Sequence, residues 1–139
     1  MSTDLTGKVA VVTGASLGIG RATAIAFGKA GASVVVNYRS HPDQAQDVVA
    51  LIEEAGGKAV AHQTDVSSLE SVEALVQRAV SEFGKLDIAV SNAAYSDREL
   101  FYQADMEGFR RTVDVTMWGA FYLTRVATQQ MIRQGDGGI

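Results

Sequence analysis

Residues 9–21 read VAVVTGASLGIGR, an apolar, β-branched run that leads directly into a turn containing three glycines. This pattern predicts a strand, a tight turn and a helix in immediate succession. Such a junction brings backbone N–H groups and a helix N-terminus to one point, which favours a phosphate there. One glycine permits the turn, one lets a pyrophosphate approach the backbone, and one lets helix and strand pack closely. We expect a side chain at Gly14 or Gly20 to block the pyrophosphate and to leave the fold intact.

Composition indicates a single globular domain of 139 residues, with 47% hydrophobic and 20% charged residues. The net charge of -4 gives no basic surface, which argues against nucleic acid as a partner. There is no cysteine, and His41 and His62 are far apart and unaccompanied, so we expect neither disulfides nor a metal site. Residues Met1–Asp4 lack the pattern of a signal peptide, and no run approaches the ~20 apolar residues of a membrane span. We therefore expect a cytoplasmic protein without a membrane segment.

Strand and helix patterns alternate along the chain. Short β-branched or apolar runs predict four strands, at Val9–Thr13, Ser33–Tyr38, Lys58–Thr64 and Leu86–Ser91. Helical patterns are predicted at Ile19–Ala30, Asp43–Ala55, Ser67–Phe83 and from Met106 to about Gln134. Local signals support these boundaries: Gly31 as a left-handed C-terminal cap, a capping box beginning at Ser67, and Asp105 as an N-cap.

Apolar strands separated by helices are typical of a parallel sheet that is buried on both faces. Right-handed crossovers then predict an α/β, Rossmann-type doubly wound sheet with its first four strands in the order 3-2-1-4. In such a sheet the ligand crevice lies at the carboxyl ends of the first and fourth strands, where the strand order reverses. The segments Gly14–Gly20 and Asn92–Ala94 both fall at this point.

The long helix carries apolar residues at three- and four-residue spacing from Phe109 through Met117 to Met131, a stripe that we expect to face the core. Apolar surface continues outside this stripe, on Trp118, Phe121, Tyr122 and Val126. A helix that is apolar around most of its circumference needs burial on a second side. We therefore predict a homo-oligomer formed through the helix Met106–Gln134.

The last residues have the pattern of a turn followed by a new strand. Gly135–Gly138 is glycine-rich, and Ile139 resembles the first residue of a fifth strand. We interpret residues 1–139 as a dinucleotide-binding domain that stops at the start of this strand. The fourth strand is then expected to be an exposed apolar edge.

The whole chain resembles the short-chain dehydrogenase/reductase family. Thr13–Gly20 (TGASLGIG) is similar to the family's cofactor turn, and Ser91–Ala94 (SNAA) resembles its Asn-Asn-Ala-Gly segment, with Ser91 and Ala94 departing from it. Asp65-Val66 resembles the pair that binds adenine, although an acid at that point also suits a turn. The resemblance implies cofactor binding by Gly14, Ser16, Gly18, Ile19, Gly20, Asp65, Val66, Asn92, Ala93 and Ala94.

The end of the second strand bears on the choice of cofactor. A dinucleotide domain for NAD usually carries an acid there, which binds the ribose 2′-hydroxyl. Residues 36–40 read VNYRS, without an acid. In the family an arginine just past this strand is associated with the 2′-phosphate, and a guanidinium suits a phosphate by bidentate hydrogen bonding. We therefore expect Arg39 and Ser40 to bind NADP, with NAD as the alternative cofactor and a solvated loop cation as the alternative interpretation of Arg39.

The catalytic residues implied by the family are Asn, Ser, Tyr and Lys. None of the four tyrosines has a lysine four residues later, so the chain contains no Tyr-x-x-x-Lys pair. Thr116 stands at the position of the family's asparagine, where it is a candidate for orienting a proton-relay water. A helical threonine also commonly bonds its own backbone carbonyl, and a hydroxyl cannot replace both functions of an amide.

These observations predict NADP-dependent hydride transfer between a nicotinamide and a small alcohol or carbonyl substrate, in a parent enzyme of which this chain alone is inactive. Two alternatives remain open. One is a nucleotide-binding module without catalysis. The other is a different Rossmann enzyme such as a methyltransferase, which Arg39 and the missing acid disfavour because that class uses a carboxylate to bind a ribose diol.

Overall fold

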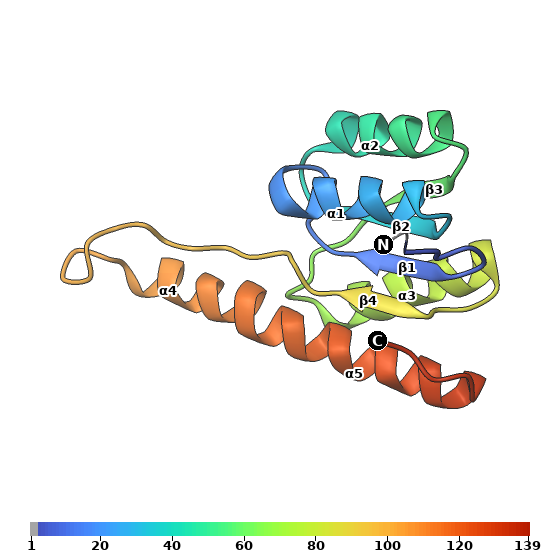
Figure 1. The fold of residues 1–139 in the computed structure, drawn as a ribbon. Coiled ribbons are helices and arrows are strands. Elements are labelled where there is room, and N and C mark those ends of the chain that lie inside the picture. Colours follow the sequence, from blue (N-terminus) through green and yellow to red (C-terminus); the bar gives the residue numbers. More distant parts are fainter. Residues whose placement is uncertain (1–2) are drawn as a thin grey trace.

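A computed structural model describes residues 3–139, so Met1 and Ser2, which entered the prediction of location, lie outside the described residues. The strands β1 (Val9–Val12), β2 (Ser33–Tyr38), β3 (Lys58–Gln63) and β4 (Ile88–Val90) form one parallel sheet in the order β3-β2-β1-β4 (Figure 1). The register places Val12 beside Val36 on one side and Val90 on the other. The predicted fold class and strand order are confirmed.

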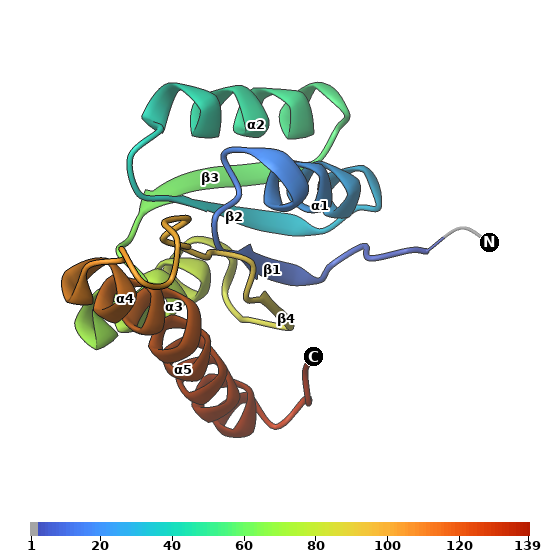
Figure 2. The same ribbon diagram turned by 90° about the vertical axis from the view of Figure 1, so that its left-hand side faces the viewer.

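Helices cover both faces of this sheet (Figures 1 and 2). The helices α1 (Gly18–Lys29) and α2 (Pro42–Glu54) lie on one face, and α3 (Leu69–Phe83) and α5 (Gly119–Gln134) lie on the other. Successive residues of β2 point into opposite cores: Val36 packs with the first pair of helices, and Val35 packs with the second. Burial on both sides explains why β1 and β2 are apolar nearly throughout.

Most of the local signals act where the sequence places them. Gly31, with φ +95°, follows the end of α1, and Asp105 accepts a hydrogen bond from the Gly108 N–H at the start of the next helix. The capping box is displaced by one residue, because Ser68 and not Ser67 is the N-cap of α3. Ser67 instead donates both its backbone N–H and its hydroxyl to the carboxylate of Asp65.

The predicted long helix is continuous but not uniform. It consists of α4 (Met106–Thr112), a π-helical segment η1 (Val113–Trp118) and α5. Each π turn takes up more residues than an α turn, so the apolar stripe does not follow one face. Phe109 and Met117 were expected in the core but are each 55% exposed, whereas Val126 was assigned to the outer surface and is buried. The stripe prediction was therefore wrong for the first half of the helix and holds only within α5.

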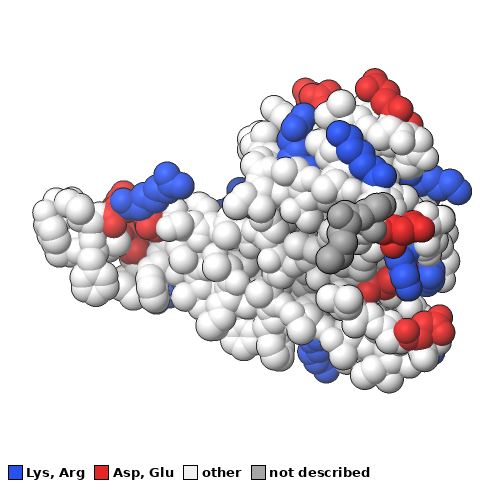
Figure 3. Space-filling view, viewed as in Figure 1, with Lys and Arg blue, Asp and Glu red and all other residues white. Residues whose placement is uncertain are grey.

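An extended segment, residues 91–105, leaves β4 and runs away from the sheet before α4 returns toward it (Figure 1). We call this segment the arm. In Figure 3 uncharged surface predominates at its tip, where Leu100, Phe101 and Tyr102 are exposed. Among the described residues, no helix has the length and hydropathy needed to cross a membrane.

The outer edge of β4 differs from the exposed edge that we expected. The Gln134 side-chain amide accepts a hydrogen bond from the Leu86 N–H and donates one to the Leu86 carbonyl, both at 2.8 Å. Further along the same edge, the Ile139 N–H donates to Asp87 O and its carbonyl accepts from Ala89 N. The chain therefore places polar partners along this edge, with Ile139 beside β4 in the manner of a neighbouring parallel strand.

Candidate functional site

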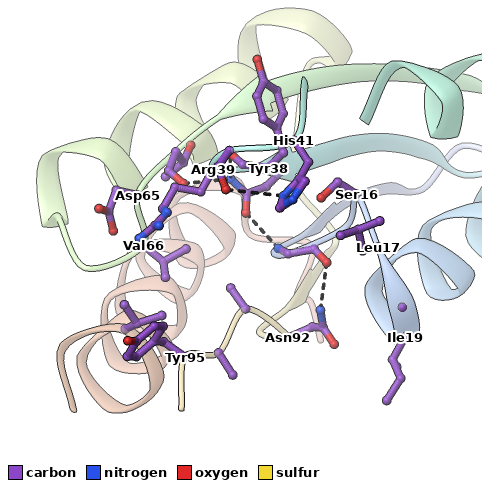
Figure 4. A pocket seen from close by; sticks show the side chains of 18 of the residues that line it. Ser16, Leu17, Ile19, Tyr38, Arg39, His41, Asp65, Val66, Asn92 and Tyr95 are labelled. Carbon is purple, nitrogen blue, oxygen red and sulfur yellow. Dashed lines mark hydrogen bonds between the residues drawn. The ribbon is translucent and has the colours of Figure 1, made fainter. Parts of the chain in front are cut away.

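A cavity of about 760 Å³ lies at the carboxyl ends of the strands, within the size range typical of ligand sites (Figure 4). It brings together eleven of the twelve predicted cofactor residues: Gly14, Ser16, Gly18, Ile19, Arg39, Ser40, Asp65, Val66, Asn92, Ala93 and Ala94. Gly20, the twelfth, and Thr116 are not among its lining residues.

The cavity also has a set of lining residues that the sequence did not reveal. Five of them adjoin a predicted cofactor residue in the sequence and one, Asn37, lies two residues before Arg39. The other two, Arg98 in the arm and Val115 in η1, lie farther from any predicted cofactor residue along the chain. The additional residues are Leu17, Asn37, Tyr38, His41, Thr64, Tyr95, Arg98 and Val115. Proximity to the predicted residues could have suggested the first group, but only the folded chain brings Arg98 and Val115 to the same cavity.

Asn37, near the end of β2, holds the glycine turn through a buried side-chain amide. Its side chain is 2% exposed, and its Oδ1 accepts a hydrogen bond from the Gly14 N–H at 2.9 Å. Its Nδ2 lies within 3.4 Å of the carbonyl oxygens of Tyr38, His62 and Thr64. An amide carries both the acceptor and the donors that this position needs, which a carboxylate does not.

Thr13 and Asn92 join the glycine turn to the end of β4. The Thr13 hydroxyl donates to Val90 O and accepts from the backbone N–H groups of Asn92 and Ala93. In return, Asn92 Nδ2 donates to the carbonyls of Thr13 and Gly14, at 2.9 and 3.1 Å. These hydrogen bonds, which are partly buried, hold the two walls of the crevice together.

The three glycines of the turn divide the expected roles between them, but the one that leaves open space is neither Gly14 nor Gly20. A Cβ on Gly20 would lie 2.3 Å from Gly14 O and 2.5 Å from Asn92 Nδ2, so Gly20 permits close packing and does not face the ligand. A Cβ on Gly14 would approach Ala93 Cα to 3.0 Å, again against the β4 segment. The expectation that a side chain would leave the fold intact is therefore wrong for Gly20, whereas for Gly14 it stays a prediction. Gly18, with φ +57° and nothing within 4 Å of its Cβ position, is the glycine that leaves open space.

Asp65 serves a turn and lines the cavity as well. Its Oδ1 accepts from the Ser67 backbone N–H at 3.0 Å and from the Ser67 hydroxyl at 2.6 Å. Both interpretations made from the sequence are therefore compatible, because the carboxylate fixes the start of α3 and its second oxygen remains available to the cavity.

Three polar side chains, those of Arg39, Ser40 and His41, follow the end of β2 at the same side of the cavity. Arg39 and Ser40 are exposed, and Ser40 Oγ lies 3.4 Å from His41 Nδ1. The Arg39 backbone is held by its carbonyl, which accepts from Gln63 Nε2 at 2.9 Å. Within the described residues, Arg39 has no carboxylate partner within 4.0 Å, so its guanidinium is free for an anion.

Thr116 lies in η1 and engages the arm. Its Oγ1 accepts from the Tyr95 N–H at 3.1 Å and donates to the Tyr95 carbonyl at 2.9 Å. The hydroxyl thus bonds a backbone 21 residues away, and not the preceding helical turn. The relay role proposed for it from the sequence stays a prediction.

Comparison with known proteins accords with this geometry. A family model described as short chain dehydrogenase matches residues 8–139. The chain is 40% identical over 139 residues to glucose 1-dehydrogenase 2 of Bacillus subtilis, covering 99% of this chain and 54% of that protein. It is 42% identical over 134 residues to L-rhamnose 1-dehydrogenase (NAD(P)(+)) of a Sphingomonas species, covering 96% and 53% respectively.

The similarity extends to solved structures. A crystal structure of a short-chain type dehydrogenase/reductase from Mycobacterium marinum superposes with a TM-score of 0.93 at 38% sequence identity. The match covers 99% of this chain and 55% of that one. The chain thus spans about half the length of the relatives that it matches.

Proposed function

The chain belongs to the short chain dehydrogenase family, and on this basis we propose that its cavity binds NADP(H) for hydride transfer between the nicotinamide and an alcohol or carbonyl substrate. The observation that carries the choice of cofactor is the end of β2. Arg39 and Ser40 line the cavity there, and the one amide of that segment, Asn37, is turned inward to hold Gly14. No acid of β2 is available to bind a ribose 2′-hydroxyl.

The lining residues fit a dinucleotide phosphate. The open space at Gly18 lets an anion approach the backbone at the N-terminus of α1, where the helix dipole favours negative charge. Alanines 93 and 94 leave room for a sugar against the backbone on the facing wall. The charges near the opening include Arg39 and Arg98, which match a polyanion.

In this proposal each group of the chain has a defined task. The nicotinamide, when bound, supplies or accepts the hydride. Arg39 and Ser40 bind the 2′-phosphate, Asp65 and Val66 contact the adenine, and Asn92 to Ala94 hold the sugar beside the turn. The chain contains no Tyr-x-x-x-Lys pair, so we propose that these 139 residues bind the cofactor without turning over a substrate. Two of the relatives are sugar dehydrogenases, so sugars are the substrate class to test first for the whole protein, with oxidation at a sugar hydroxyl.

Replacing Arg39 with alanine tests the choice of cofactor. We expect the affinity for NADPH to fall by about 1.5–3 kcal/mol, the value of a hydrogen bond to a charged group, because the 2′-phosphate loses its guanidinium. The affinity for NADH should change little, since NADH has no phosphate at that position. Fluorescence titration of both cofactors against the wild-type chain and the variant measures the difference.

Lys29 provides a matched control, since it is an exposed cation that does not line the cavity. Lys29→Ala should leave both affinities unchanged. Equal losses of NADPH and NADH affinity in Arg39→Ala would refute the assignment. Tighter binding of NADH than NADPH by the wild-type chain would reverse the preference.

A non-catalytic nucleotide-binding module remains the second candidate function. The presence of Thr116 at the position of the family's asparagine favours it. Cofactor binding alone does not separate the two functions. The discriminating measurement is NADP-dependent oxidation of a sugar by the full-length gene product.

We also propose that two copies of the chain associate through the outer face of the long helix. Trp118 and Phe121 are 41% and 54% exposed, and their rings meet edge to face with centroids 5.7 Å apart. Asp114 precedes these rings and Arg125 follows them, at spacings of four residues. In an antiparallel, two-fold pairing, Asp114 of one copy would lie opposite Arg125 of the other, with the aromatic rings between them.

Phe121→Glu should therefore convert a dimer into a monomer, because it would bury a carboxylate in an apolar interface. Analytical ultracentrifugation over a range of concentrations gives the oligomeric state. Leu51→Glu, at an exposed leucine on α2, is the control and should leave the dimer intact. A wild-type chain that stays monomeric at every concentration would contradict the proposal.

A further inference from the structure

We propose that Arg111 and Thr112 are positioning residues for the cofactor, because they fasten the start of the arm as a wall of the cavity. This inference rests on the proposed function, since it presumes that a dinucleotide occupies the cavity. Neither residue lines the cavity itself. Their effect is transmitted through Tyr95 and Asp97, which belong to the arm.

The arm reaches the cavity through its first residues. Ala94, Tyr95 and Arg98 line the cavity, although they lie beyond the end of β4 and outside any helix or strand. Ala94 and Tyr95 are exposed, and backbone there is not held by a sheet ladder. A segment of this kind keeps one conformation only where specific contacts hold it.

Thr112 supplies one such contact from the last residue of α4. Its Oγ1 accepts a hydrogen bond from the Asp97 N–H at 3.2 Å and donates one to Gly108 O at 3.0 Å. The hydroxyl is thus used as acceptor and as donor at once. With the two bonds between Thr116 and Tyr95, it places three hydrogen bonds between the long helix and residues 95–97.

Arg111 supplies a contact of a different kind. Its guanidinium carbon lies 4.9 Å from the centroid of the Tyr95 ring, a distance at which a cation is attracted to the face of an aromatic ring. Its Nε is buried and has no hydrogen-bond partner among the described residues. Within the described part of the chain, Arg111 also has no carboxylate within 4.0 Å. The Tyr95 ring is therefore the partner that accounts for the placement of this cation.

The fastened segment faces the end of the cavity assigned to adenosine. Val115, which lines the cavity, also packs in the same core cluster as Val66. Figure 4 shows Tyr95 on the side of Asp65 and Val66, away from Ile19 at the start of α1. Arg111 and Asp65 moreover line one shared hollow next to the cavity. Loosening of the segment should therefore weaken contacts to the adenosine half of the cofactor.

The test compares binding of NADPH with binding of adenosine 2′,5′-bisphosphate, which carries only the adenosine half. Thr112→Val removes the hydroxyl at nearly constant volume and should weaken both ligands by the same factor, about three- to tenfold. Arg111→Gln should weaken both by about two- to fivefold. Thr112→Ser and Arg111→Lys keep the hydroxyl and the cation, so they should restore most of the affinity.

Arg133→Gln is the matched control, because Arg133 is an exposed arginine of the same long helix and lines neither the cavity nor the hollow next to it. It should leave both affinities unchanged. Unfolding midpoints in urea, measured for every variant, identify any loss of affinity that arises from loss of fold. Arg111→Gln removes a contact outside the core clusters and provides a folded test if Thr112→Val does not fold.

Different results overturn different claims. If the wild-type chain binds neither ligand, the proposed function fails and this inference fails with it. If the wild-type chain binds both and the two variants bind equally well, only the positioning role is refuted. Losses that serine and lysine do not restore, or losses of NADPH affinity without losses of bisphosphate affinity, also refute it.

Discussion

Replacing Gly20 with valine is expected to destabilise the protein by about 3 kcal/mol or more, enough to remove much of the stability of a domain of this size. The first atom of any side chain at this position would lie 2.3 Å from Gly14 O, a backbone atom that cannot move away by rotating a side chain. It would also lie 2.5 Å from Asn92 Nδ2, whose hydrogen bonds join the turn to the β4 segment. Urea unfolding followed by circular dichroism measures the change in the free energy of unfolding.

Gly18→Ala separates packing from backbone strain. Gly18 has φ +57°, so alanine there costs about 1–2 kcal/mol for the left-handed conformation, but it meets no neighbouring atom. We expect this variant to fold and to lose cofactor affinity, since its methyl group occupies the space that an anion would use. If Gly20→Val is as stable as Gly18→Ala, the close packing at Gly20 is not important for the fold.

Replacing Asn37 with aspartate should destabilise the fold by about 3–5 kcal/mol at neutral pH, through an unpaired charge in a buried site. The new carboxylate could not donate to the carbonyls of His62 and Thr64, and it would face them as a like partial charge. Burial would raise the pKa of this carboxyl above its unfolded value, so its neutral form would be favoured in the folded state. The destabilisation should therefore be smallest below the unfolded pKa of about 4 and should grow as the pH rises through the folded value.

Urea unfolding of Asn37→Asp from acid to neutral pH measures this dependence. Ser40→Asp introduces the same charge at an exposed position and should leave stability nearly unchanged. If Asn37→Asp is as stable as Ser40→Asp at neutral pH, the amide is not needed to hold the glycine turn. Because of this expected loss of stability, an acid at residue 37 is not a simple route to NAD specificity in this chain.

The sheet could be predicted from the sequence because its determinants are local. The run SVVVNY, with glycine before it and polar residues after it, matches β2 at both ends, Ser33 and Tyr38. Parallel order then follows from the helices between the strands, and the crevice follows from the point where the strand order reverses. For this reason eleven of the twelve predicted cofactor residues meet in one cavity.

What could not be predicted depends on contacts between distant residues. The partner of Thr116 lies 21 residues away, and no proline or glycine marks the start of η1 at Val113. Without knowledge of the π turn, a constant helical period places Met117 in the core, where the structure has it exposed. Asn37 has no local signal at all, because its partner Gly14 precedes it by 23 residues.

The capping box shows a smaller error of the same origin. Ser67 and Ser68 are equally suited to cap a helix, and the sequence offers no reason to choose the second. The choice is made by Asp65, whose carboxylate already holds both donors of Ser67.

The paired hydrogen bonds between Gln134 and Leu86 fix the number of residues that connect the end of α5 to the edge of β4. Gln134 binds both backbone groups of Leu86, two residues before β4, and Ile139 binds Asp87 and Ala89 five positions after Gln134. The four residues between them thus span a set distance and decide which residue stands opposite Ile88. Because side chains alternate between the faces of a sheet, one residue more or fewer in 135–138 would turn the side chain beside β4 from one face of the sheet to the other. The number of residues in this turn consequently matters as much as the flexibility of its glycines.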